Sequence, residues 1–141
     1  MTVFADSSAL VKLYADEAGA ELVRATKLFV VSALARVEVP SAIWRKHRLG
    51  QLAAADAGVL TTAFEADWYG ATGPFVPIVC GDTVLATAAA LVRTHGLRAY
   101  DGVQLASAVV ARAADSGVDT LLCFDAELSE AAAREGFGVA A

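Results

Sequence analysis

The sequence predicts an α/β domain with a mostly parallel sheet of four to five strands, helices on both faces and a helical hairpin. Short apolar runs alternate along the chain with longer segments of helical periodicity, and strands joined through helices pair in parallel. With 141 residues, 57% of them hydrophobic, the chain can form one substantial core. We therefore expect residues 1–141 to form a single domain.

Two kinds of segment carry this prediction. Runs rich in apolar and β-branched residues, closed by polar or turn residues, are expected as strands at 2–5, 28–31, 76–80, 120–124 and, more weakly, 137–140. Segments of helical spacing follow them, several after a capping residue, and are expected as helices at 9–14, 33–48, 51–69, 82–95, 100–116 and 126–135. Since no strand separates the helices over 33–48 and 51–69, these two form the hairpin.

Composition and charge exclude several classes of protein. Charged residues such as Arg36 and Arg112 interrupt the apolar stretches, which excludes a membrane-spanning helix. The first residues lack the positive start and apolar stretch of a secretory signal, so we expect a cytoplasmic protein. Cys80 and Cys123 are expected to be unpaired, buried thiols. The net charge of −5 argues against a broad basic surface, so any contact with nucleic acid would be local or bridged by metal.

Common catalytic motifs are missing from the sequence. It contains no glycine-rich loop for a dinucleotide or a nucleoside triphosphate and no C-x-x-C pair. His47 and His95 lack metal-ligand spacing with each other, and both are expected at the surface. Nucleophilic catalysis by a Ser/His or Cys/His pair therefore has no positioned histidine.

Four carboxylates instead occupy unusual places. Asp6 and Asp125 follow two of the expected strands, whose carboxyl ends share one edge of a parallel sheet. Asp101 opens a helix, and Glu38 lies in a helix beside its core-facing side. Taken singly, the aspartates are interpreted as helix N-caps and Glu38 as a partly exposed helical residue. Together, these acids would repel one another unless a cation held them, which favours a site for a hard metal ion.

Four motifs follow one another along the chain: Val3–Tyr14 (VFADSSALVKLY), Glu38 in the next long helix, Leu97–Ala108 (LRAYDGVQLASA), and Leu121–Asp125 (LLCFD) followed by Ala131-Ala132 and Gly136. Together they resemble the PIN domain and, more narrowly, the VapC-type toxins of bacterial toxin–antitoxin pairs. The resemblance spans nearly the whole chain. It implies a parallel sheet with flanking helices, and endoribonuclease activity that depends on Mg²⁺ or Mn²⁺.

Carried over position by position, the resemblance implies one set of catalytic, metal-binding acids: Asp6, Glu38, Asp101 and Asp125. Ser8 is then a polar neighbour of Asp6. The family often has Thr two residues before its last acid, where this chain has Cys123, so a weak thiol donor replaces a hydroxyl. Pro40 lies inside the helix that carries Glu38, removes one backbone hydrogen bond and predicts a kink there that displaces Glu38.

The resemblance also implies a substrate and partners. One or two Mg²⁺ or Mn²⁺ ions would bring an RNA phosphate to the acids, activate water and stabilise the charge of the attacking and leaving oxygens. Four cations are candidates for contacts with RNA: Lys12, Arg45, Lys46 and Arg98. A cognate antitoxin would neutralise the enzyme, and a homodimer is expected. The apolar residues of the first two helices form either ordinary core or an antitoxin groove: Leu10, Leu13, Tyr14, Leu22 and Val23.

Two other functions are considered. A PIN-like protein of weak or no catalytic activity would act by binding RNA or its partner, and Cys123 and Pro40 leave room for that alternative. A receiver-type phosphoacceptor with Asp82 as its acceptor is disfavoured, because the first strand ends in one acid and no lysine follows Lys46.

Overall fold

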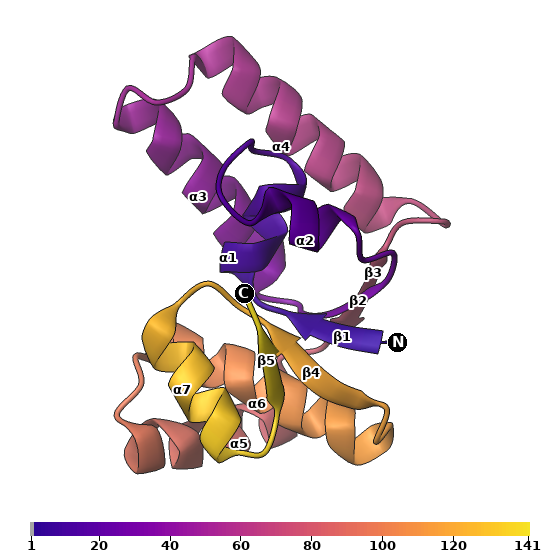
Figure 1. Ribbon diagram of the computed structural model, residues 1–141, viewed down its shortest axis with the longest axis vertical. Helices are drawn as coiled ribbons and strands as arrows, with labels where there is room; N and C mark the ends of the chain where they lie inside the picture. Colours follow the sequence, from indigo (N-terminus) through magenta and orange to yellow (C-terminus); the bar gives the residue numbers. More distant parts are fainter. Residues whose placement is uncertain (1) are drawn as a thin grey trace.

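A five-stranded, all-parallel sheet organises the computed structural model, which describes residues 2–141 (Figure 1). Its strand order is β3-β2-β1-β4-β5. The strands are β1 (Thr2–Ala5), β2 (Phe29–Ser32), β3 (Phe75–Ile78), β4 (Val118–Leu122) and β5 (Gly138–Ala140). The predicted sheet is confirmed, and the weak strand expected near the C-terminus forms one of its edges.

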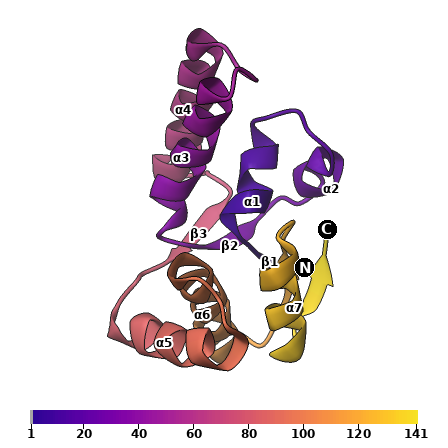
Figure 2. The same ribbon diagram turned by 90° about the vertical axis from the view of Figure 1, so that its left-hand side faces the viewer.

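Helices cover both faces of this sheet. They are α1 (Ser7–Leu10), α2 (Ala20–Arg24), α3 (Ala35–Arg48), α4 (Ala54–Tyr69), α5 (Asp82–His95), α6 (Ala99–Ala114) and α7 (Ala126–Arg134), and a 3-10 turn, η1 (Val11–Leu13), follows α1. The first four helices lie on one side of the sheet and the last three on the other (Figure 2). The predicted helical hairpin is confirmed, because α3 and α4 pack side by side and project beyond the sheet.

The two faces of the sheet build two separate cores. In β1, Val3 and Ala5 pack beneath α1–α4, whereas Phe4 packs against the α5–α7 side. This alternation follows from the period of two residues along a strand. Because helices cover both sides, β1 and β2 are buried almost throughout on both faces, which explains why most of their residues are apolar.

The strand order creates a crevice at the carboxyl edge of the sheet. From β1 the chain winds outward to β2 and β3, and then returns to β4 and β5 on the other side of β1. Ala5 pairs with Leu122 across β1 and β4, and the N–H of Asp6 donates to the Leu122 carbonyl (3.2 Å). Open parallel sheets bind ligands at such a reversal of strand order. The fold therefore brings together the residues that follow β1 and β4.

Several smaller expectations have a clear outcome. Cys80 and Cys123 are unpaired, as predicted, but only Cys123 is buried; Cys80 is partly exposed. Helix α3 is helical on both sides of Pro40. The surface position expected for His95 is wrong: its side chain is 5% exposed, and its Nε2 lies 2.8 Å from Glu135 Oε2 at the end of α7. Within residues 2–141, no helix combines the length and apolar character needed to cross a membrane.

The aromatic cluster beneath the hairpin generates a stability prediction. Phe64 of α4 is fully buried, and its ring centroid lies 5.7 Å from that of Tyr14 and 5.6 Å from that of Trp68. The substitution Phe64→Ala should lower the free energy of unfolding by about 3–5 kcal/mol, because it leaves a cavity in the core.

Urea denaturation measures this loss. The matched control Val59→Ala lies on the same helix at a side chain that is 67% exposed, and it should change the free energy of unfolding by less than about 0.5 kcal/mol. Equal losses in the two variants would contradict the core described here.

Candidate functional site

All four predicted acids line one pocket of about 250 Å³ at the carboxyl edge of the sheet. Eight residues form its lining: Asp6, Ser7, Ser8, Glu38, Ala42, Asp101, Gln104 and Asp125. The acids come from four places in the chain, namely the ends of β1 and β4 and the helices α3 and α6. Four carboxylates and no basic side chain lie in this lining, so the pocket concentrates negative charge.

Asp6 is the most deeply buried of the four acids. It is 4% exposed and forms the N-cap of α1, accepting a hydrogen bond from the Ala9 N–H (3.1 Å) and another from Ser8 Oγ (2.7 Å). The Cys123 thiol donates to its second oxygen (3.3 Å). Burial raises the pKa of Asp6 to about 6, although these hydrogen bonds oppose the shift; the charge of Glu38 adds to it. The ionised form of the Asp6 carboxyl group is therefore destabilised by its burial.

Glu38 faces the pocket from α3 and is held by two donors. Ser7 Oγ donates to its Oε1 (2.9 Å), and Gln104 Nε2 donates to the same oxygen (2.6 Å). The displacement of Glu38 that the Pro40 kink suggested is therefore not what the structure shows, because Glu38 lines the pocket with the other acids.

The remaining two acids lie at the start of α6 and α7. Asp101 is half-buried in the first turn of α6. Burial raises its pKa, and so do the charges of Asp125 and Glu38, while Arg98 opposes the shift. Asp125 is exposed and caps α7 by accepting a hydrogen bond from the Leu128 N–H (2.9 Å). The effects of Asp125 and Glu38 on Asp101, and of Glu38 on Asp6, connect the four acids electrostatically.

Cys123 connects two of the acids. Its Sγ donates to Asp6 Oδ2 and accepts a hydrogen bond from the backbone N–H of Asp125 (3.3 Å each). Burial raises the pKa of this thiol to about 12, and the charge of Asp6 adds to the shift. The thiol therefore stays protonated and serves as a hydrogen-bond donor. Ser8, the other predicted neighbour of Asp6, also accepts a hydrogen bond from the Phe124 N–H (3.0 Å).

Gln104 is a pocket residue that the sequence prediction missed. It is 2% exposed and lies on α6 among apolar residues such as Leu105 and Ala108. A signal was present, since Gln104 is three residues after Asp101 and positions i and i+3 share a helix face. A polar residue on the buried side of a helix that begins with a candidate acid marks the pocket.

The donor chemistry of the pocket fits a hard divalent cation. Every acidic donor is a carboxylate oxygen, the ligand type that Mg²⁺ and Mn²⁺ favour. Burial, and after it the charge of neighbouring acids, raises the pKa of Asp6 and Asp101, and the pocket lining contains no basic side chain. Within residues 2–141, however, no three His, Cys, Asp or Glu side chains are grouped closely enough to hold a metal ion. Protein donors occupy Asp6, Glu38 and Asp125, so these carboxylates would have to converge on a cation.

The four predicted RNA-contacting cations fall into two groups. Lys12 is buried and donates to Glu17 Oε1 (2.9 Å) and to the Ala18 carbonyl (2.7 Å), and Lys46 donates to the other oxygen of Glu17. Burial would raise the pKa of Glu17, but these two lysines lower it below its usual value. Arg45 and Arg98 are exposed and make no ion pair with any residue of the described chain. The arginines are therefore the better placed candidates.

A basic groove adjoins the carboxylate pocket. It has a volume of about 300 Å³ and shares Ser8 and Ala42 with the pocket. Its charged lining residues are Lys12, Glu17, Arg45 and Lys46. An acidic pocket and a groove with an excess of positive charge thus lie side by side.

The predicted antitoxin groove is only partly available as a surface. Of the two alternatives left open for these residues, Leu10 and Val23 follow the first, because both are fully buried in the core and are not groove residues. Leu13 and Tyr14 are half-buried, and Leu22 is 41% exposed. The apolar periodicity of this segment could not distinguish buried core residues from partly exposed ones, because both kinds lie on the same apolar stripe.

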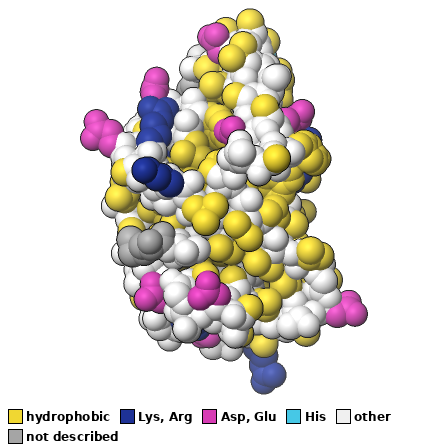
Figure 3. Space-filling model, turned by 90° about the vertical axis from the view of Figure 1, so that its right-hand side faces the viewer, with side chains coloured by type: hydrophobic (Ala, Val, Ile, Leu, Met, Phe, Trp, Pro, Cys, Tyr) yellow, Lys and Arg dark blue, Asp and Glu magenta, His cyan; other side chains and the backbone are white. Residues whose placement is uncertain are grey.

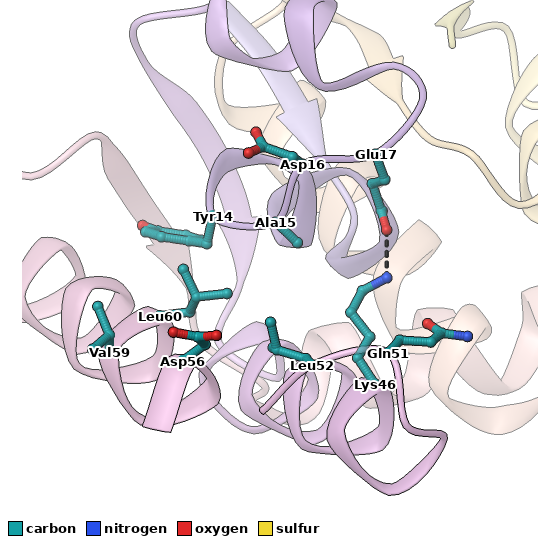
Figure 4. A pocket seen from close by; sticks show the side chains of 10 residues that line it. All are labelled: Tyr14, Ala15, Asp16, Glu17, Lys46, Gln51, Leu52, Asp56, Val59 and Leu60. Carbon is teal, nitrogen blue, oxygen red and sulfur yellow. Dashed lines mark hydrogen bonds and ion pairs between the residues drawn. The ribbon is translucent and has the colours of Figure 1, made fainter. Parts of the chain in front are cut away.

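A separate cavity of about 560 Å³ opens between the loop after η1 and the helical hairpin (Figure 4). Tyr14, Leu52 and Leu60 contribute apolar surface, and the Glu17–Lys46 ion pair lies at one end. Asp6, Glu38, Asp101 and Asp125 are absent from its lining. This cavity is therefore distinct from the carboxylate pocket.

Comparison with known proteins supports the fold. The crystal structure of PAE2754 from Pyrobaculum aerophilum superposes with a TM-score of 0.64 at 23% sequence identity, over 99% of this chain and 89% of that chain. No protein-family model matches the sequence. No curated protein matches it either. The likeness to PAE2754 therefore establishes a shared fold over almost the entire chain.

The burial of Asp6 generates a prediction about pH. A carboxyl group whose pKa rises from 3.8 in the unfolded chain to about 6 in the folded protein binds more protons when folded, so stability falls as the pH rises from about 4 to about 6. The shift corresponds to about 3 kcal/mol. In EDTA, Asp6→Asn should match the wild-type free energy of unfolding near pH 4 and exceed it by up to that amount at pH 7.5.

Urea denaturation across this pH range measures the difference. Asp82→Asn, an exposed acid at the start of α5, provides the control and should follow the wild-type profile. A wild-type protein that gains stability relative to Asp6→Asn as the pH rises would show that Asp6 is not buried at a cost.

Proposed function

We propose that this protein is a metal-dependent endoribonuclease of the PIN-like type, acting as the VapC-type toxin of a toxin–antitoxin pair in the cytoplasm. One observation carries the proposal: Asp6, Glu38, Asp101 and Asp125, from four separate elements, line a single pocket at the reversal of strand order. The motifs that contain these acids resemble those of that family in the same order along the chain.

The four acids are suited to hold one or two Mg²⁺ or Mn²⁺ ions. When bound, such an ion supplies an electrophile for the phosphodiester and activates water for its hydrolysis. Asp6 is oriented by three hydrogen bonds, and Glu38 is oriented by two. Asp101 is half-buried and enters the pocket from α6. Asp125 lines the same pocket, and its negative charge raises the pKa of Asp101. Catalysis in this scheme requires no histidine.

The basic groove and Arg98 would guide the RNA backbone. A pocket of four carboxylates repels a polyanion, so phosphates on either side of the cleaved bond need cations nearby. Arg45 contributes one from the groove on α3, and Arg98 lies close enough to Asp101 to affect its pKa. Lys12 is a poorer candidate, because its ammonium group is bonded to Glu17 and lies over the Phe124 ring (4.4 Å).

Protein partners complete the proposal. A cognate antitoxin would neutralise the enzyme, with Leu13, Tyr14 and Leu22 as the predicted groove residues that retain exposed surface. Wide hydrophobic areas occur on the face of the molecule shown in Figure 3, and extended apolar surface of this kind favours protein association. This supports the expectation of a homodimer.

A second function has one observation in its favour. The described carboxylates are not grouped to hold a metal ion as they stand, which is what a PIN-like module of weak or no activity would show. Such a module would act by binding RNA or a protein partner. The assay below separates the two functions.

The nuclease proposal predicts cleavage of total cellular RNA by the purified protein. Discrete fragments should form with Mg²⁺ or Mn²⁺ and disappear with EDTA. Asp101→Asn should lower the cleavage rate by at least about 100-fold, since it removes a charged oxygen ligand of the proposed cation. Gel electrophoresis of RNA incubated with each protein provides the measurement.

The matched control is Asp82→Asn, which neutralises an exposed acid outside the pocket and should cleave like wild type. If the folded wild-type protein cleaves with neither metal ion, the binding module becomes the better description. Cleavage by the purified protein that survives both EDTA and Asp101→Asn would refute the assignment of this site.

A further inference from the structure

We propose that Gln104 is a positioning residue that holds Glu38 in place for a cation in the carboxylate pocket. The inference rests on the proposed metal-dependent function and names a residue outside the acids themselves. Gln104 lies on α6 and Glu38 on α3. The two residues are 66 positions apart in the sequence, so the contact between them joins two distant helices.

The contact is part of a closed triangle of hydrogen bonds. Gln104 Nε2 donates to Glu38 Oε1 (2.6 Å) and to Ser7 Oγ (3.0 Å), and Ser7 Oγ donates to the same Glu38 oxygen (2.9 Å). Glu38 Oε1 receives two hydrogen bonds, which leaves Oε2 as the oxygen without a contact to Ser7 or Gln104.

The triangle fixes the orientation of the Gln104 amide. Turning the amide over would place its carbonyl oxygen against the Glu38 carboxylate, where two acceptors face each other. In the orientation present, Gln104 Oε1 is buried and has no hydrogen-bond partner in the described structure. A buried carbonyl without a partner opposes folding, so the amide is not explained by stability of the core.

The surroundings of Gln104 lead to the same conclusion. Its neighbours on α6, Leu105, Ala106 and Ala108, are fully buried apolar residues, and an apolar side chain at position 104 would need no hydrogen-bond partner. What the amide adds is a donor nitrogen within hydrogen-bond distance of both Ser7 Oγ and Glu38 Oε1. Its contribution is therefore to the geometry of the pocket.

Gln104 also links two of the acids. It lies one helical turn after Asp101 on α6, so its bond to Glu38 relates the acid on α3 to the acid on α6. Without this bond, Glu38 would keep Ser7 as its donor and gain rotational freedom. A side-chain amide that orients a metal-binding carboxylate in this way contributes to metal affinity.

The test is Mn²⁺ binding by the intact protein without RNA, measured by calorimetry or by the electron paramagnetic resonance signal of free Mn²⁺. Gln104→Met has a similar length and no donor, and it should weaken Mn²⁺ binding by about 10- to 100-fold. The control Ser107→Ala lies on the same helix, where the buried hydroxyl bonds only the Val103 carbonyl (2.7 Å), and it should bind Mn²⁺ within about 2-fold of wild type.

A double-mutant cycle distinguishes positioning from general damage. If Gln104 acts through Glu38, Gln104→Met should cause no further loss of Mn²⁺ affinity in a Glu38→Ala background. An equal loss in both backgrounds would overturn the proposal. Should Gln104→Met fail to fold, Gln104→Asn carries the same test, because it keeps the amide but withdraws it from Glu38.

The outcomes also separate this inference from the function on which it depends. Wild-type protein that binds no Mn²⁺ would refute the cation site and the role of Gln104 together. Wild-type protein that binds Mn²⁺ as tightly as Gln104→Met would refute the role of Gln104 alone and leave the proposed cation site standing.

Discussion

The concentration of four carboxylates in one pocket without a balancing base is the constraint on which the rest of the site depends. Burial and mutual repulsion raise the pKa of Asp6 and Asp101, so the folded structure disfavours the ionised form of these two carboxyl groups. The surrounding donors reduce that cost: Ser8, Ala9 and Cys123 for Asp6, and Ser7 and Gln104 for Glu38. A cation would relieve the remaining repulsion, which is why the pocket is best understood as a metal site.

Two of the acids serve the fold and the site at once. Asp6 and Asp125 cap α1 and α7, and each also lines the pocket. This double role follows from the parallel sheet, in which a strand ends where the next helix begins, at the same edge as the ligand crevice. A capping residue there is already directed toward the site, so capping and metal binding are compatible explanations of one aspartate.

The sequence predicted the fold well because its signals are local and repeated. Apolar runs closed by polar residues marked the first four strands, and a weaker apolar run marked the last. Asp6, Asp101 and Asp125 marked the starts of three helices, two of them as N-caps. The gathering of the acids was also predictable, since strand ends of a parallel sheet share an edge.

What depended on contacts between distant segments could not be predicted. Gln104 is identified as a pocket residue by its hydrogen bonds to Ser7 and Glu38. Lys12 and Lys46 form ion pairs with Glu17, which lies in a loop whose path the sequence does not specify. Leu10 and Val23 belong to the core, although their spacing fits a groove equally well. The most direct test of the central claim is the anomalous diffraction of Mn²⁺ in crystals of the wild-type protein. The account predicts a peak in the pocket within bonding distance of Asp6 and Asp101 oxygens, and a peak elsewhere, or none at saturating Mn²⁺, would contradict it.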